Sequence, residues 1–247
     1  MNNKKFVSFI TAGDPSLDKT KEFIEVLSEY SDFVEVGIPF SDPIAEGDVI
    51  EAANARALAG GTTTEKVFDM LKTVKLSPAK SCKLVILTYI NPVFAYGYDK
   101  FGKRCKECGV HDLVIPDLPF EERAEVEGHL NKYGVHLITL LAPTSAERVK
   151  KLASVASGGF VYLVSSMGTT GVRTKFDSDL AKTVTQIKKS TKIPVCVGFG
   201  ISTPEQAQNI RKIADGVIVG SAIVKIIAEH GNNSGAYIKE YIQTLVN

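Results

Sequence analysis

Eight short apolar runs, separated by longer amphipathic stretches, are the feature of this sequence that most restricts its fold. The runs are rich in Val, Ile, Leu and Phe and cover residues 6–11, 33–36, 83–88, 112–115, 136–141, 160–164, 194–198 and 216–219. Most are apolar throughout instead of alternating, which is expected of parallel strands that are covered on both faces. We therefore predict eight buried parallel strands.

Helices are predicted between these strands, most clearly at residues 19–30, 119–133, 145–155, 177–189 and 203–214. The last of them starts at the segment Ser202-Thr203-Pro204-Glu205, which offers a capping residue, a Pro in the first turn and an early acidic residue, a typical helix start. Each strand–helix unit is about 30 residues long, as a βαβ unit requires. Eight such units favour a closed (β/α)8 barrel, the TIM-barrel fold, over an open sheet. No Ser- or Gly-rich linker divides the chain, so residues 1–247 are predicted to form a single domain.

The charge balance excludes several classes of partner. Lys and Arg total 29 against 28 Asp and Glu, so the net charge is +1 and no overall field favours nucleic acid or an anionic membrane. No apolar run approaches the ~20 residues of a membrane span, and the N-terminal segment lacks the pattern of a signal peptide. We expect a cytoplasmic protein without a nucleic-acid or membrane partner.

The cysteines and histidines give little sign of a metal site. Cys105 and Cys108 form one C-x-x-C pair, whereas a structural zinc site needs four ligands and the sequence has no second pair. The four histidines are predicted to lie away from the strand ends that carry chemistry in a barrel. We therefore expect neither a metal nor a histidine-based catalytic triad.

A carboxylate at the end of the second strand is the first candidate for catalysis. Glu35 lies within an apolar run, and burial would oppose its ionisation and raise its pKa into a range useful for acid–base chemistry. An outward-facing or ion-paired Glu would give the same pattern, so the sequence leaves these alternatives open. The loop that follows contains Asp42, Glu46, Asp48 and Glu51. Acidic residues are common just before a helix because the helix N-terminus favours negative charge, so the sequence alone gives none of these four a functional role.

Two glycine-containing turns indicate a phosphate site. Gly198-Phe199-Gly200 follows the seventh run and Gly220-Ser221 follows the eighth, and each turn leads into a predicted helix. Glycine lets the backbone approach an anion closely, and a helix N-terminus supplies N–H donors. Barrels often bind phosphate after strands seven and eight. Two tight turns without a ligand are the alternative.

Six motifs, taken in order, resemble one known family. They are FITAGDP at residues 9–15, EVGIPFSDP at 35–43, YINP at 89–92, PDLP at 116–119, GFGIS at 198–202 and GSAIV at 220–224. Together they are similar to the α subunit of tryptophan synthase over nearly the whole chain. The resemblance implies a lyase of tryptophan biosynthesis that cleaves indole-3-glycerol phosphate, by a retro-aldol reaction, to indole and glyceraldehyde 3-phosphate. It also implies no cofactor or metal in this chain.

The resemblance further implies roles for individual residues. Glu35 would be the general acid/base, and Glu46 stands where the family has an Asp that binds the indole N–H. The expected substrate-binding residues are Phe9, Leu87, Tyr89, Tyr162 and Thr170, the last on a loop that closes over the substrate. The expected phosphate-binding residues are Gly171, Phe199, Gly200, Gly220 and Ser221.

The Glu at position 46 is a departure that leaves the function open. Its side chain has one methylene more than Asp, about 1.5 Å of extra reach, and a misplacement of about 1 Å can cost on the order of a hundredfold in rate. The leading hypothesis is a lyase that works with a pyridoxal-phosphate-dependent β subunit, in a heterotetramer of two α and two β subunits. The loop containing Asp42 would then face that partner. A weakly active chain that mainly activates the β subunit and a stand-alone indole-releasing lyase are the alternatives.

Overall fold

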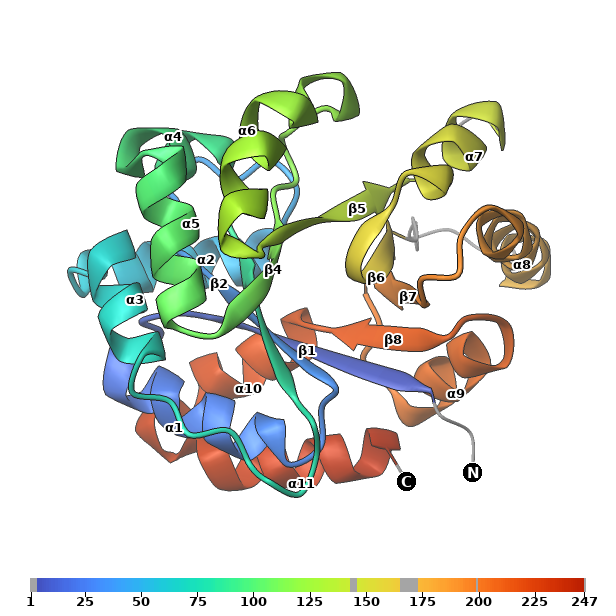
Figure 1. The fold of residues 1–247 in the computed structure, drawn as a ribbon. Helices are drawn as coiled ribbons and strands as arrows, with labels where there is room; N and C mark the ends of the chain where they lie inside the picture. Colours follow the sequence, from blue (N-terminus) through green and yellow to red (C-terminus); the bar gives the residue numbers. More distant parts are fainter. Residues whose placement is uncertain (1–3, 143–145, 165–172, 199, 247) are drawn as a thin grey trace.

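Eight parallel strands close into a barrel in the order of the sequence, with the helices arranged around it (Figure 1). The computed structural model describes residues 4–142, 146–164, 173–198 and 200–246. The strands are β1 Lys5–Thr11, β2 Phe33–Gly37, β3 Lys83–Leu87, β4 Val110–Val114, β5 His136–Leu141, β6 Ser157–Val164, β7 Val195–Gly198 and β8 Gly216–Val219. The predicted (β/α)8 barrel and its eight strands are therefore confirmed.

The largest difference in a strand boundary lies at β6, which begins at Ser157 and not at residue 160. The extra residues include Gly158 and Gly159, which have no side chain and so give no apolar signal in the sequence. The backbone N–H of Gly159 donates to the buried Asp112 carboxylate at 2.9 Å. The early part of β6 is also paired with β5, at Ser157 and Ile138.

The helices are α1 Leu17–Ser28, α2 Asp48–Ala59, α3 Thr64–Leu71, α4 Ile90–Tyr96, α5 Tyr98–Glu107, α6 Arg123–Leu130, α7 Ala146–Ser154, α8 Arg173–Ser190, α9 Pro204–Ile213, α10 Ser221–His230 and α11 Ser234–Val246. The helix predicted at residues 119–133 is α6 with a short 3-10 helix on each side, η1 Phe120–Glu122 and η2 Asn131–Tyr133. The capping argument for α9 holds, since Thr203 and Gln206 form a capping box. No helix in the described ranges is both long and apolar enough to cross a membrane.

The barrel interior is filled by one layer of side chains, to which each strand contributes one residue. The layer consists of Val7, Phe33, Val85, Val114, Ile138, Phe160, Cys196 and Ile218. A second, larger apolar cluster lies between the outer face of the strands and the helices. Because the interior layer is packed, as in other barrels of this type, open space is expected only above it, toward the carboxyl ends of the strands.

Candidate active site

The next inward-facing positions lie two residues beyond the interior layer, because side chains alternate between the two faces of a strand. They are Phe9, Glu35, Leu87, Pro116, Leu140, Tyr162, Gly198 and Gly220. All of them except Gly198 line a cavity of about 440 Å³ at the carboxyl ends of the strands. This volume is in the range of small-molecule sites, about 300–1,000 Å³.

Glu35 on β2 is the most unusual group in this cavity. Its side chain is 1% exposed, and neither carboxylate oxygen has a hydrogen-bond partner within the described part of the chain. Burial, and secondly the nearby Glu46 carboxylate, raise the pKa of Glu35 to about 8. Of the orientations that the sequence left open, the structure has the inward, unpaired one. A carboxyl group of this kind carries a proton at neutral pH and can donate it.

Glu46 faces the same cavity from the loop between β2 and α2, and Tyr89 holds it there. The Tyr89 hydroxyl donates to Glu46 Oε2 and accepts from the backbone N–H groups of Ile44 at 2.9 Å and Ala45 at 3.0 Å. Burial raises the pKa of Glu46, and the bond from Tyr89 partly offsets this effect. Tyr89 itself is 2% exposed and is not among the lining residues. It contributes to the site by holding the loop and the Glu46 carboxylate.

Phe9 forms an apolar wall of the cavity because two glycines leave room for its ring. A Cβ atom at Gly37 would lie 2.8 Å from Phe9 Cζ, and one at Gly220 would lie 3.2 Å from Phe9 Cβ. Phe9 forms a small apolar cluster with Ala53 and Val224, against which Ile50 and Leu87 pack. The sequence predicted Phe9 and Leu87 in the site, and the structure brings both to the cavity.

Tyr162 on β6 lines the same cavity as Glu35 and Glu46. Burial, and then the charges of Glu35 and Glu46, raise the pKa of Tyr162 well above its usual value. Its hydroxyl therefore stays protonated over the working pH range of an enzyme. A Cβ atom at Gly198 would lie 2.9 Å from this hydroxyl, so glycine is required beside it.

The turns after β7 and β8 form the opposite end of the cavity. Gly200 has a φ of +71°, a conformation that favours glycine, and Gly220 and Ser221 stand at the start of α10. All three line the cavity, and no Lys or Arg does so within the described residues. An anion bound at this end would contact backbone N–H groups and the Ser221 hydroxyl. The other predicted positions, Thr170, Gly171 and Phe199, lie outside the described residues.

Several lining residues were not singled out in the sequence. They are Ala45, Gly47, Ile50, Val114, Pro116, Leu140, Val164, Ile201 and Ile218. Pro116 and Leu140 lie two residues beyond members of the interior layer. Runs that are apolar throughout do not show which face points inward, so the sequence alone does not single these two residues out. The described residues contain no group of three or more His, Cys, Asp or Glu that could hold a metal ion.

Comparison with known proteins places the chain in a family. The family model described as tryptophan synthase alpha chain matches residues 1–246. The tryptophan synthase alpha chain of Lacticaseibacillus casei is 47% identical over 245 residues, which cover 99% of this chain and 91% of the relative. That of Methanocaldococcus jannaschii is 46% identical over 233 residues, which cover 94% and 82% of the two chains.

Solved structures agree with this assignment. Tryptophan synthase subunit alpha from Campylobacter jejuni has a TM-score of 0.89 at 36% identity, covering 99% of this chain and 96% of that chain. A chain from the tryptophan synthase α2β2 complex of Pyrococcus furiosus has a TM-score of 0.88 at 35% identity, covering 99% of each chain. The chain belongs to the tryptophan synthase alpha chain family.

Proposed function

We propose that this chain cleaves indole-3-glycerol phosphate to indole and glyceraldehyde 3-phosphate, as the α subunit of a tryptophan synthase complex. The observation that carries the proposal is the position of Glu35, buried and unpaired at the bottom of a cavity whose other end is formed by the turns at Gly200 and Gly220. Membership of the family supports the same reaction.

The two ends of the cavity fit the two ends of this substrate. The phosphate would bind at the turns after β7 and β8, where Gly220 and Ser221 begin α10. In a closed eight-stranded barrel, β3 and β4 lie opposite β7 and β8. The apolar Leu87, Val114 and Pro116 line the cavity on that opposite side, where they would contact the indole ring.

Glu35 supplies the proton that the reaction needs. The bond between indole C3 and the first glycerol carbon breaks, and a proton takes the place of that carbon on C3 of the released indole. Glu35 with its raised pKa is protonated at neutral pH and donates to C3; its carboxylate then receives the proton of the hydroxyl group that becomes the aldehyde. The proton count balances, and Glu35 ends in the state in which it began.

Glu46 stabilises the charge that develops on the ring. Protonation at C3 makes the indole nitrogen electron-poor, and a carboxylate that accepts its N–H hydrogen bond lowers the energy of this state. The extra methylene of Glu46 is accommodated because Tyr89 and the backbone N–H of Ala45 both donate to Glu46 Oε2. We therefore assign Tyr89 a positioning role and expect the enzyme to be active despite the Asp-to-Glu difference.

The proposed chemistry needs no cofactor or metal in this chain. The protonated indole ring itself accepts the electron pair of the breaking bond, so no external electron sink is required. Pyridoxal phosphate belongs to the partner β subunit, which joins indole to serine. The substrate carries a charged phosphate, which crosses a bilayer poorly, so we place the enzyme in the cytoplasm with the rest of the pathway.

Purified chain mixed with indole-3-glycerol phosphate, with and without a β subunit, tests the proposal directly. Release of indole that increases on adding the β subunit is the expected result. Background release together with stimulation of the β reaction would instead make the chain a regulatory subunit. Robust release without any binding of the β subunit would make it a stand-alone lyase.

Exposed apolar side chains at the barrel mouth suggest where the β subunit binds. Ile44, in the loop after β2, is 76% exposed, and Phe94 on α4 is 66% exposed. Ile44 follows β2 and Phe94 follows β3, which are neighbouring strands, and the exposed Asp42 stands two residues before Ile44. Large exposed apolar groups of this kind are typical of interfaces.

Phe94→Asp is expected to weaken binding of the β subunit about 10- to 100-fold, because an anchor residue lost from an interface costs about 1–3 kcal/mol. Isothermal titration with purified β subunit measures the effect. Tyr237→Asp on α11 is the matched control, since Tyr237 is an exposed aromatic residue (47%) of an outer helix. Equal affinities for the two variants would remove α4 from the interface.

Gly37→Ala is expected to raise the KM for indole-3-glycerol phosphate about tenfold. The new methyl group would lie 2.8 Å from Phe9 Cζ and push the ring into the cavity, and such overpacking costs about 1–3 kcal/mol. Steady-state kinetics with saturating β subunit measure the change. The double variant Gly37→Ala with Phe9→Leu should recover part of the loss; failure to recover would show that Phe9 does not transmit the effect.

A further inference from the structure

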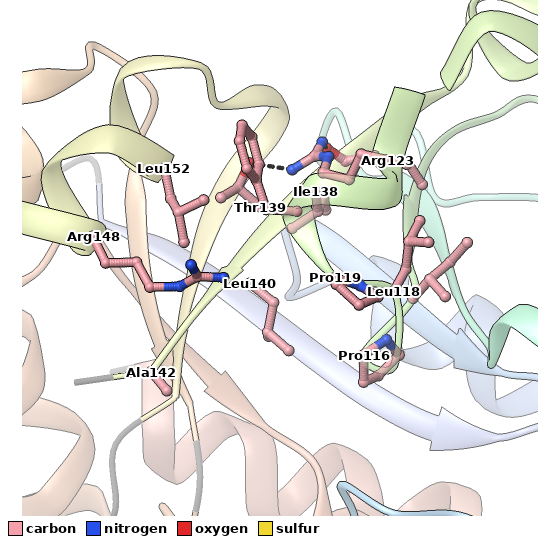
Figure 2. A pocket seen from close by; sticks show the side chains of 13 residues that line it. Pro116, Leu118, Pro119, Arg123, Ile138, Thr139, Leu140, Ala142, Arg148 and Leu152 are labelled. Carbon is pink, nitrogen blue, oxygen red and sulfur yellow. Dashed lines mark hydrogen bonds between the residues drawn. The ribbon is translucent and has the colours of Figure 1, made fainter. Parts of the chain in front are cut away.

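A second cavity lies outside the barrel, next to the substrate cavity. It has a volume of about 220 Å³ and lies between the η1–α6 segment and α7, over β5 (Figure 2). Leu118 and Leu152 line it from opposite sides. Pro116 and Leu140 line both this outer cavity and the substrate cavity. The two spaces are therefore separated at this point by these two residues.

The pairing of the strands explains why the barrel wall is thin here. β4 and β5 are paired at two positions, Asp112 with His136 and Leu113 with Leu137. On its other side, β5 stays paired with β6 as far as Leu141. Among the described residues, the upper half of β5 therefore has no strand paired with it on the β4 side.

Where the pairing of β4 with β5 ends, an arginine side chain forms hydrogen bonds with β5. Arg123 is 7% exposed and donates to the backbone oxygen of Leu137 at 2.7 Å and to Thr139 Oγ1 at 2.9 Å. Pro116 and Leu140 lie nearer the carboxyl ends of the strands, and each lines both the outer cavity and the substrate cavity; Figure 2 shows their side chains. Both are only partly buried, which is consistent with free space on each side of them.

Pro116 and Leu140, which separate the two cavities, lie where the far edge of the substrate's indole ring would be. With the phosphate at β7 and β8, the benzene edge of the indole points toward β3, β4 and β5, where Leu87, Pro116 and Leu140 line the cavity. We propose that Leu140 determines the specificity for the ring. It excludes indoles with a substituent on the benzene edge, and the outer cavity is a latent subsite for such a substituent. This inference rests on the proposed function and on the orientation given there.

The reverse reaction provides the test, since glyceraldehyde 3-phosphate can be condensed with indole or with methyl- and bromo-indoles substituted at each benzene carbon in turn. In Leu140→Ala, the ratio of kcat/KM for a substituted indole to that for indole should rise about tenfold or more for at least one ring position. One methylene of pocket space is worth about 10- to 200-fold in such discrimination. Leu87→Ala is the matched control, because it enlarges the substrate cavity on β3 and does not reach the outer cavity.

Filling the outer cavity shows whether the substituent binds there or whether Leu140→Ala only enlarges the substrate cavity. Leu118→Trp or Leu152→Trp, each added to Leu140→Ala, should abolish the gain, because both residues line the outer cavity and not the substrate cavity. Thermal unfolding of each variant shows whether it is folded. The two Trp substitutions fill the outer cavity from opposite walls, so either one that folds can test the subsite.

The inference is overturned if wild-type enzyme condenses indole but Leu140→Ala shows no selective gain. It is also overturned if the gain persists in both filled variants or is matched by Leu87→Ala at the same ring position. Absence of condensation with indole by the wild-type enzyme together with its β subunit would instead refute the proposed function.

Discussion

Replacing Glu35 by Gln is expected to lower kcat for indole release by about 10²- to 10⁴-fold, the contribution that a positioned acid–base group typically makes. The amide has nearly the same shape as the protonated carboxyl group, so the substrate cavity and the KM should change little. It cannot deliver a proton to indole C3 or recover one from the glycerol hydroxyl. Steady-state release of indole with saturating β subunit measures the effect.

The pH profile adds a second readout. Because the pKa of Glu35 is raised to about 8, the protonated form declines above that pH, and kcat/KM of the wild-type enzyme should fall as the pH rises through this range. The residual activity of Glu35→Gln should lack this fall. Glu240→Gln, an exposed acid on α11, is the matched control for loss of one negative charge. Wild-type activity in Glu35→Gln would refute the assigned role.

Much of the barrel could be predicted because its strands are buried on both faces. Such strands are apolar over their whole length, so the β5 and β8 boundaries agree with the sequence prediction. Phe9 and Tyr162 are expected in the site only from the family resemblance, because runs that are apolar throughout do not show which side chains face the barrel interior. The structure has both residues in the lining of the cavity.

Features that depend on contacts distant in sequence could not be predicted. The orientation of Glu35 depends on how β2 packs between β1 and β3, and the bond from Tyr89 to Glu46 joins residues 43 positions apart. The opening between β4 and β5 depends on where two strands stop pairing, which local patterns do not encode. The sequence therefore indicated that Glu35 could be buried with a raised pKa, but not its unpaired orientation, the contact from Tyr89 to Glu46 or the outer cavity.

The buried state of Glu35 should also make the stability of the protein fall as the pH rises. Its pKa is about 8 in the folded protein, against an ordinary value of 4.5 in an unfolded chain. Between these values the folded chain holds a proton that the unfolded chain has released, so the free energy of unfolding decreases with increasing pH. The full stability is present below about pH 4.5, and the loss is complete above about pH 8. Each pKa unit corresponds to about 1.4 kcal/mol, so the loss is on the order of several kcal/mol, a large part of a typical total of about 5–15 kcal/mol.

Urea unfolding of wild type and Glu35→Gln at pH 5, 7 and 9 measures this loss. The amide does not titrate, so the variant should gain stability relative to wild type as the pH rises, by several kcal/mol between pH 5 and 9. Asp112, whose pKa is also raised by burial, is present in both proteins and cancels in the difference. Parallel pH dependences would show that Glu35 is solvated or paired in solution. Burial of Glu35 destabilises the ionised enzyme and also keeps Glu35 protonated at neutral pH. A Glu35→Gln variant that is more stable than wild type at high pH but inactive would therefore show that the burial which supplies the catalytic proton also lowers the stability of the protein.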